Sequence, residues 1–282
     1  MKIGYLGPPG TFTQQAAMTF GEIIVPSDPR ELIDYPSIED ALRAAADGKA
    51  DIAAVPLENS TEGAVNATID LLIFDYDLHI QRELVLPISQ CLLRRREFVH
   101  MPRVEKIYSH SQSLAQCRKY LHAHYPSAEL IPMTSNAEAA RLVERAGENA
   151  EPIAAAIAAI GPALAADVYH LAIAAENIQD EANNATAFVA LSEKRSGLTA
   201  GGKATIAFST VNRPGSLYKI LDIFALWDIN MTKIVSRPMK NHPGEYVFYV
   251  DLEDYQTKDL ADALTLVQRK TNFYKYLGSY FR

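Results

Sequence analysis

Lys2-Ile-Gly-Tyr-Leu-Gly-Pro-Pro-Gly-Thr-Phe-Thr-Gln14 is the stretch that decides the fold class. Its first five residues have the pattern of a short strand, and Gly7-Pro-Pro-Gly10 ends that strand with a turn. Thr11 and Gln14 then have the spacing of a capping box, in which two side chains satisfy the first free N–H groups of a helix. A strand, a tight turn and a helix in succession predict a β-α unit at the start of the chain.

The same β-α pattern recurs along the first two thirds of the chain. Residues with capping-box spacing at Ser37–Asp40 and Ser135–Glu138 predict two more helix starts. Apolar runs predict strands at 51–55, 107–109, 129–131 and 152–156. Because the pattern restarts near residue 106, we expect two similar lobes with mostly parallel sheets and a ligand cleft between them.

A polar, glycine-rich segment at residues 193–202 then interrupts the pattern and predicts a linker. After it, strands are expected at 203–210, 230–238, 245–252 and 272–281, with helices from Pro214 and over 257–269. This βαββαβ order is typical of a ferredoxin-like unit. The sequence therefore predicts an α/β protein with a two-lobed domain over 1–192 and a ferredoxin-like domain over 203–282.

Charge is distributed unevenly along the chain, whose formal net charge is −7. Residues 201–282 carry 11 Lys/Arg and 8 Asp/Glu, whereas residues 1–200 carry 16 and 26, so the tail is +3 and the body −10. An acidic body repels phosphate backbones, and no basic stripe interleaved with aromatic residues is present. We therefore expect no nucleic-acid partner.

Secretion, membrane insertion and metal binding are likewise not indicated. The N-terminus enters a strand directly, and no run approaches the roughly 18 apolar residues of a membrane span, so we expect a cytoplasmic protein. Cys91 and Cys117 lack the spacing of a zinc site or a disulfide framework. The seven histidines also lack ligand spacing. We expect no metal and no membrane contact.

Four polar loops at predicted strand ends are the candidates for chemistry, because the standard nucleophile, phosphate and zinc motifs are missing. Each loop alone is typical of turn or cap chemistry. If the four converge on one cleft, they form a polar anion-binding pocket. The loops are Gly7–Thr13, Pro56–Gly63, Ser109–Gln112 and Asn183–Phe188.

Longer motifs in these loops resemble the prephenate dehydratase family in the right order over essentially the whole chain. They are Gly4-Tyr-Leu-Gly-Pro-Pro-Gly-Thr-Phe-Thr13, Pro56-Leu-Glu-Asn-Ser60, Ser109-His-Ser-Gln112 with Leu114-Ala-Gln-Cys117, and Glu176-Asn-Ile-Gln-Asp180. Pro214-Gly-Ser-Leu217 and Asn230-Met-Thr-Lys-Ile-Val-Ser-Arg-Pro238 resemble the effector motifs of the family's C-terminal ACT domain. The resemblance implies a two-lobed catalytic domain like that of periplasmic binding proteins, followed by an ACT regulatory domain.

The resemblance also implies a reaction and a set of site residues. The family converts prephenate to phenylpyruvate, water and carbon dioxide without a cofactor, and its end product L-phenylalanine regulates it. Thr186 matches the threonine that assists departure of the ring hydroxyl. The resemblance further implies a homodimer or homotetramer. Substrate binding is expected at Thr11, Asn59, Ser60, Gln112 and Phe188, and phenylalanine binding at Asn212, Gly215, Ser216, Leu217 and Asn230.

The chain departs from the family pattern at three positions. Ala187 replaces the usual arginine of a Thr-Arg-Phe motif, which we expect to supply positive charge to a dianionic substrate. Val235 replaces an acidic residue of the second effector motif, and Ser111 replaces a proline at a helix start. Ala187 leaves open a catalytically impaired aromatic-acid sensor. Arogenate dehydratase and a non-aromatising prephenate decarboxylase are further alternatives, because substrate choice is not readable from the sequence.

Overall fold

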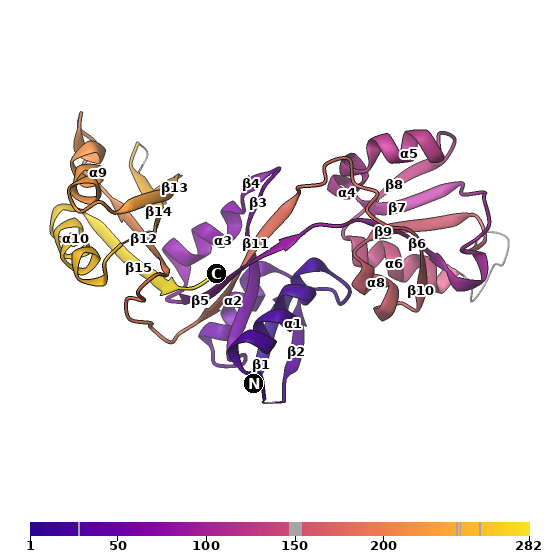
Figure 1. Cartoon of the computed structure of the whole chain (residues 1–282), viewed down its shortest axis with the longest axis horizontal. Coiled ribbons are helices and arrows are strands. Elements are labelled where there is room, and N and C mark those ends of the chain that lie inside the picture. Colours follow the sequence, from indigo (N-terminus) through magenta and orange to yellow (C-terminus); the bar gives the residue numbers. More distant parts are fainter. Residues whose placement is uncertain (28, 147–153, 241, 243, 254) are drawn as a thin grey trace.

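The structure is a computed structural model that describes residues 1–282 except 28, 147–153, 241, 243 and 254. Three sheets succeed one another along the long axis of the molecule (Figure 1). We call the middle sheet with its helices lobe 1, the one on the right of the view lobe 2, and the one on the left the C-terminal unit. The two-lobed α/β architecture followed by a ferredoxin-like unit that the sequence predicts is confirmed.

Lobe 1 is built on a sheet with the order β2-β1-β3-β11-β5, flanked by helices. Its strands are β1 (Lys2–Leu6), β2 (Glu31–Tyr35), β3 (Ile52–Asn59), β5 (His79–Pro87) and β11 (Ala185–Ser192), and the short β4 (Gly63–Ala64) pairs with β3. Its helices are α1 (Phe12–Ile24), α2 (Ile38–Ala46) and α3 (Asn66–Asp70), the last continued by a π-helical turn over Leu71–Asp75.

Lobe 2 repeats this plan with the sheet order β10-β6-β9-β7-β8. Its strands are β6 (Cys91–Arg95), β7 (Lys106–His110), β8 (Glu129–Met133), β9 (Ile157–Gly161) and β10 (Leu171–Ala175). Its helices are α4 (Ser111–Gln116), α5 (Arg118–His124), α6 (Asn136–Arg145) and α8 (Ala163–Val168), with a 3₁₀ turn at Arg96–Phe98. Apolar clusters fill both faces of this sheet.

Both sheets are mixed, whereas the sequence pattern predicted mostly parallel sheets. In lobe 1, β11 runs antiparallel to both of its neighbours, β3 and β5. In lobe 2, β6 runs antiparallel to both β9 and β10. Each of these strands is the first that the chain enters after crossing from the other lobe. No crossover helix precedes such a strand, so the parallel pairing that a β-α unit imposes does not apply to it.

The C-terminal unit is a four-stranded antiparallel sheet with the order β13-β14-β12-β15. Its strands are β12 (Lys203–Ser209), β13 (Asn230–Pro238), β14 (Tyr246–Glu253) and β15 (Phe273–Tyr280), and its helices are α9 (Ser216–Leu226) and α10 (Thr257–Lys270). The two helices cover one face of the sheet and enclose an apolar core. This is the predicted βαββαβ order.

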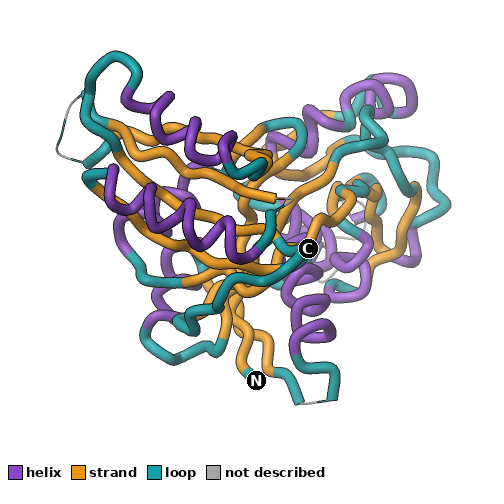
Figure 2. The backbone as a smooth tube through the Cα atoms, turned by 60° about the vertical axis from the view of Figure 1, so that its left-hand side comes forward, coloured by secondary structure: helices purple, strands orange, loops and turns teal. Residues whose placement is uncertain are grey.

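The other face of the C-terminal sheet packs against lobe 1. Ala207, Val247 and Leu277 belong to the same buried cluster as Ile80 and Leu191 of lobe 1. The C-terminus lies beside β5 in Figure 1, and Figure 2 shows it among strands near the middle of the molecule. Phe281 forms a β-bridge with Arg82 of β5. Since their apolar core is continuous, lobe 1 and the C-terminal unit form one packed body, to which lobe 2 is attached by two chain crossings.

One predicted strand is displaced. The sequence placed it at 152–156, of which 152 and 153 lie outside the described residues, whereas β9 begins at Ile157. The region from 153 to 160 is an almost continuous run of Ala and Ile, which carries no alternation to fix a strand boundary. In the described part of the chain, no helix has both the length and the apolar character needed to span a membrane.

Candidate active site

A cavity of about 430 Å³ lies between lobe 1 and lobe 2. All four polar loops singled out in the sequence contribute to its wall, and together they supply nine of its nineteen described lining residues. The lining residues are Leu6, Gly7, Pro8, Thr11, Phe12, Thr13, Pro36, Asn59, Ile88, Gln90, His110, Gln112, Ser113, Gln116, Thr134, Ser135, Asn136, Pro162 and Thr186. The predicted convergence of these loops on one cleft is therefore observed.

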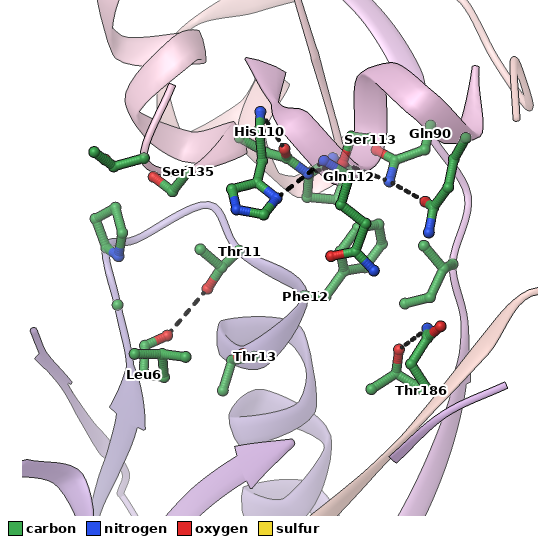
Figure 3. Close-up of a pocket in the computed structure, with 18 of the residues that line it drawn as sticks. Leu6, Thr11, Phe12, Thr13, Gln90, His110, Gln112, Ser113, Ser135 and Thr186 are labelled. Carbon is green, nitrogen blue, oxygen red and sulfur yellow. Dashed lines mark hydrogen bonds between the residues drawn. The ribbon is translucent and has the colours of Figure 1, made fainter. Parts of the chain in front are cut away.

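Helix N-termini from both lobes open onto this cavity. Thr11 caps α1 by accepting a hydrogen bond from the Gln14 N–H at 3.2 Å. Across the cleft, Ser135 caps α6 by accepting from the Glu138 N–H at 3.0 Å. Figure 3 shows Thr11 and Phe12 of α1 facing His110 and Gln112 of lobe 2. Free N–H groups and the helix dipole at such ends favour negative charge, so the cleft is suited to an anion with two charged ends.

Among the described residues that line the cavity, His110 alone has an ionisable side chain. Its Nδ1 accepts a hydrogen bond from the backbone N–H of Gln112 at 3.4 Å. In this arrangement Nε2 is the nitrogen left to donate to a ligand. In the described part of the chain, no group of three or more His, Cys, Asp or Glu side chains is placed to hold a metal ion.

Thr186 and Asn59 are directly paired on neighbouring strands β11 and β3. Asn59 Nδ2 donates to Thr186 Oγ1 at 2.8 Å and to Asn184 Oδ1 at 2.9 Å, and both side chains are more than nine-tenths buried. The amide therefore occupies a lone pair of the Thr186 oxygen. Thr186 keeps its own proton to donate, and the cavity is the space open to it. A donor bound to the oxygen also polarises the O–H bond.

The orientation of the Asn59 amide is fixed at both ends. Its Oδ1 accepts from the backbone N–H groups of Thr61 at 3.0 Å and Glu62 at 3.2 Å. The partner carbonyl of Asn184 also accepts from the hydroxyls of Ser60 and Thr61, each at 3.3 Å. A flipped amide would face carbonyl oxygens with its oxygen and N–H groups with its nitrogen. Asn59 is therefore a positioning group for Thr186 rather than only part of the wall.

A polar network in lobe 2 holds the opposite wall. Asn136 Oδ1 accepts from the Ser109 hydroxyl at 2.9 Å, and its Nδ2 donates to Ser113 Oγ at 2.9 Å. Gln90 Nε2 donates to the same Ser113 oxygen at 3.1 Å. The Gln112 side chain extends from this wall into the cavity (Figure 3). The network links the residue just before β6 with β7, α4 and α6, and so fixes the frame from which Gln112 projects.

One hydrogen bond links the two lobes at the edge of the cavity. Tyr169 of lobe 2 donates its hydroxyl to the carbonyl of Pro9 in lobe 1 at 2.8 Å. Gly10 has a positive φ of 84°, and a Cβ there would lie 2.8 Å from the Tyr169 ring. Burial raises the pKa of Tyr169, so it remains a neutral donor. The glycine thus allows the turn after β1 to close against lobe 2.

The residues expected to bind substrate fall into two groups. Thr11, Asn59 and Gln112 line the cavity together with Thr186. Ser60 lies outside it and hydrogen-bonds to Asn184 and Ala185. Phe188 is 2 % exposed and packs in the core of lobe 1. Neither Ser60 nor Phe188 is placed to touch a ligand in this cavity.

Ala187 also lies outside the cavity, which corrects the expectation that this position faces the substrate. Side chains alternate along β11, so Thr186 points into the cleft and Ala187 to the opposite face. There it lines a separate space of about 280 Å³ together with Glu58, Lys203 and Lys233. An arginine here would meet those charged side chains. Position 187 therefore does not contribute to the wall of the interlobe cavity.

The expected effector residues do not form one cluster within the chain. Asn212, Gly215, Ser216 and Leu217 follow β12 at one end of the sheet, where Gly215 adopts φ 77° just before α9. Asn230 starts β13 and pairs with Glu253, at the opposite end. The two ends are separated by a strand of about seven residues, or roughly 23 Å. Val235 packs against the buried cluster shared with lobe 1.

Ten of the nineteen described lining residues lie outside the four candidate loops. The capping pattern at Ser135 predicted the α6 N-terminus, yet Thr134, Ser135 and Asn136 were not assigned to the site. Gln116 belongs to a motif that resembles the family, and His110 belongs to a candidate loop, but neither was assigned to the site. Gln90 follows no local pattern, because it reaches the cavity through the crossing between the lobes. These residues are brought in by the closure of lobe 2.

The fold and the site define a two-lobed protein with a polar cleft between the lobes and an appended ferredoxin-like unit. The family model for prephenate dehydratase matches residues 3–196. A prephenate dehydratase of Lactococcus lactis subsp. lactis is 41% identical over 92% of this chain and 89% of its own length. A bifunctional chorismate mutase/prephenate dehydratase of Aquifex aeolicus is 38% identical over 99% of this chain and 73% of its own length.

A solved structure supports the same family assignment. The crystal structure of a prephenate dehydratase from Arthrobacter aurescens in complex with L-Phe superposes with a TM-score of 0.85 at 33% identity, covering 100% of this chain and 90% of that one. The chain belongs to the prephenate dehydratase family of lyases.

Proposed function

We propose that the interlobe cavity converts prephenate to phenylpyruvate, with Thr186 as the hydroxyl donor. Loss of the ring carboxylate as carbon dioxide leaves its electron pair in the ring, and the C–OH bond breaks as the ring becomes aromatic. The departing oxygen needs a hydrogen bond that strengthens as negative charge develops on it. The observation that supports this role is the Asn59 amide bond to Thr186 Oγ1, which reserves the threonine proton for the cavity.

Binding of the dianionic substrate is assigned to groups other than arginine or lysine. The N-termini of α1 and α6 lie on opposite walls, and His110 Nε2 and the Gln112 amide add donors between them. Two carboxylates held by dipoles and neutral donors need no cation in the cleft. Because Ala187 lies outside this cleft, it gives no support to the impaired-sensor alternative.

For the whole chain, we assign catalysis to residues 1–192, a linker to 193–202 and regulation to 203–282. The regulatory ligand we propose is L-phenylalanine, which is bound in the related Arthrobacter aurescens structure. Asn230 and the 212–217 loop lie at opposite ends of the sheet, so one site containing both needs two chains. This geometry supports a homodimer or homotetramer. A cytoplasmic location stays a prediction.

The direct test incubates the purified protein with prephenate or arogenate and follows the products by chromatography. Phenylpyruvate from prephenate is the expected result. Phenylalanine from arogenate alone would change the substrate, and a non-aromatic decarboxylated acid would change the reaction. If neither substrate is consumed while L-phenylalanine binds, the sensor alternative holds instead. Size-exclusion chromatography with light scattering tests the dimer or tetramer.

A further inference from the structure

The C-terminal unit meets lobe 1 through ion pairs that all have the same polarity. In each pair the cation comes from the C-terminal unit and the carboxylate from lobe 1, which gives the opposite net charges of tail and body a structural role. Among the described residues, the pairs are Lys203–Glu83 at 2.8 Å, Lys233–Glu58 at 2.9 Å, Arg237–Asp70 at 2.6 Å, Lys240–Asp75 at 2.7 Å, Lys275–Asp77 at 3.9 Å and Arg282–Glu83 at 3.1 Å.

The Lys233–Glu58 pair is adjacent to the catalytic threonine. Glu58 and Ala187 are paired across β3 and β11, and the next pair along the same ladder is Asn59 and Thr186. Because side chains alternate, Asn59 and Thr186 face the cavity while Glu58 and Ala187 face the C-terminal unit. The pair therefore holds the reverse side of the two-residue segment that aims the Asn59 amide.

The Lys233–Glu58 ion pair lies where the ladder between β3 and β11 is irregular. The ladder register shifts here, since Ala187 pairs with Glu58 but Phe188 pairs with Pro56. Such a bulge interrupts regular pairing next to the site. Beside it, the small Ala187 leaves part of the 280 Å³ space into which Glu58 can turn. Lys233 itself is fixed, because its side chain is 12% exposed and its Nζ lies 5.6 Å from the Tyr249 ring centre.

We propose that Lys233, a residue of the C-terminal unit, is a positioning residue for the dehydration: it holds Glu58 and thereby the orientation of Asn59 toward Thr186. The inference rests on the function proposed above. Lys233 also lies three residues along β13 from the expected effector residue Asn230. A ligand that shifts β13 therefore acts on the same contact, which gives regulation a physical route to the reacting group.

The test compares full-length variants in the absence of phenylalanine. Lys233→Met and Glu58→Gln should each lower kcat roughly 3- to 10-fold with KM for prephenate nearly unchanged, because the pair acts on positioning and not on substrate contact. Lys233→Arg should restore kcat to within about twofold of wild type. The matched control is Lys240→Met, which removes another ion pair of the same interface far from β3 and should leave kcat unchanged. The double variant Lys233→Met/Glu58→Gln should lose no more kcat than the more impaired of the two single variants, because both substitutions remove the same interaction.

A second measurement is independent of turnover. The side-chain amide resonance of Asn59, assigned with an Asn59→Ser variant, should move in Lys233→Met and stay in place in Lys240→Met. An unmoved resonance, or a wild-type kcat in Lys233→Met, would overturn the inference while leaving the proposed function intact. Equal losses in Lys233→Met and Lys240→Met would also overturn it, because they would show a general interface effect. Absence of prephenate turnover in the wild type would overturn the proposed function, and the amide resonance would still decide the role of Lys233.

Discussion

At the scale of single residues, the Asn59 amide explains how a weakly acidic threonine hydroxyl is aimed. The sequence motif singles out Thr186 as the hydroxyl donor. It indicates Asn59 only as a site residue and does not predict its hydrogen bond to Thr186. The contact joins residues 127 positions apart, so no local pattern encodes it. The register between β3 and β11 places Asn59 opposite Thr186. The orientation of the amide follows from the two hydrogen bonds that Asn59 Oδ1 accepts from backbone N–H groups.

Replacing Asn59 with leucine keeps the branched shape of the side chain, with a larger volume, but removes the hydrogen bond to Thr186. We expect kcat to fall about 10- to 100-fold, because the threonine hydroxyl is no longer held in its productive rotamer. KM should change less than kcat. Thr265→Ala serves as the control, since Thr265 lies on α10 of the C-terminal unit, where its hydroxyl donates to the Ala261 carbonyl of the same helix, and its kcat and KM should stay within about twofold of wild type. Equal kinetics for both variants in steady-state assays would remove Asn59 from the account.

Ala187→Arg tests the position of the missing arginine. The structure places this side chain on the face of β11 that meets the C-terminal unit, beside Glu58 and Lys233. An arginine there cannot touch the substrate, so we expect KM for prephenate within about twofold of wild type. A large fall in KM, as expected if this position faced the substrate, would show that β11 is rotated relative to the present register.

At the scale of elements, the sequence predicted types better than boundaries and pairings. Capping patterns at Thr11, Ser37 and Ser135 located three helix starts correctly, because each cap is a local hydrogen bond. The strand at 230–238 was also placed correctly. The mixed character of both sheets was missed, since strand direction depends on where the chain crosses between lobes. Arg94 is 1% exposed and donates to the Ala155 carbonyl at 2.7 Å, a burial that no local sequence pattern indicates.

The turn after β1 provides an element-scale prediction about closure of the cleft. Tyr169→Phe removes the hydrogen bond to the Pro9 carbonyl, which is worth about 1 kcal/mol, so kcat/KM should fall roughly fivefold. Gly10→Ala should cost more, because it adds both an unfavourable φ and a contact with the Tyr169 ring. Steady-state kinetics together with small-angle scattering would show a more open molecule. If both variants keep wild-type kcat/KM, the turn does not contribute to closure.

At the scale of the whole molecule, lobe 1 and the C-terminal unit share a core that contains ionisable groups. Burial raises the pKa of Tyr249 and of Tyr280 well above 10.0. Desolvation lowers the pKa of Lys203, but attraction from Asp251 and Glu83 outweighs it and raises the pKa overall. These groups keep their protons when folded at pH values where the unfolded chain releases them.

The sign of the pH effect follows from this difference. Above pH 10.0, an unfolded tyrosine loses its proton while the buried one retains it, so stability falls as pH rises. Lys203 acts in the same direction, because its contribution is present below its unfolded pKa and is lost as pH rises through the folded one. Each tyrosine contributes a slope of up to about 1.4 kcal/mol per pH unit. Denaturant melts from pH 9 to about 11 should show this decline and a shallower one for Tyr249→Phe, whereas equal slopes would exclude Tyr249 as a source.

The most direct test of the whole account is the steady-state kinetics of Thr186→Val with prephenate. Valine keeps the β-branched shape that suits β11 and deletes only the hydroxyl. Because the hydroxyl acts as the C–O bond breaks, kcat should fall by about two to three orders of magnitude, with KM close to wild type and little change in Tm. A Thr186→Val enzyme that retains nearly full kcat would contradict the assignment, and the donor to the leaving oxygen would have to be another group in the cleft.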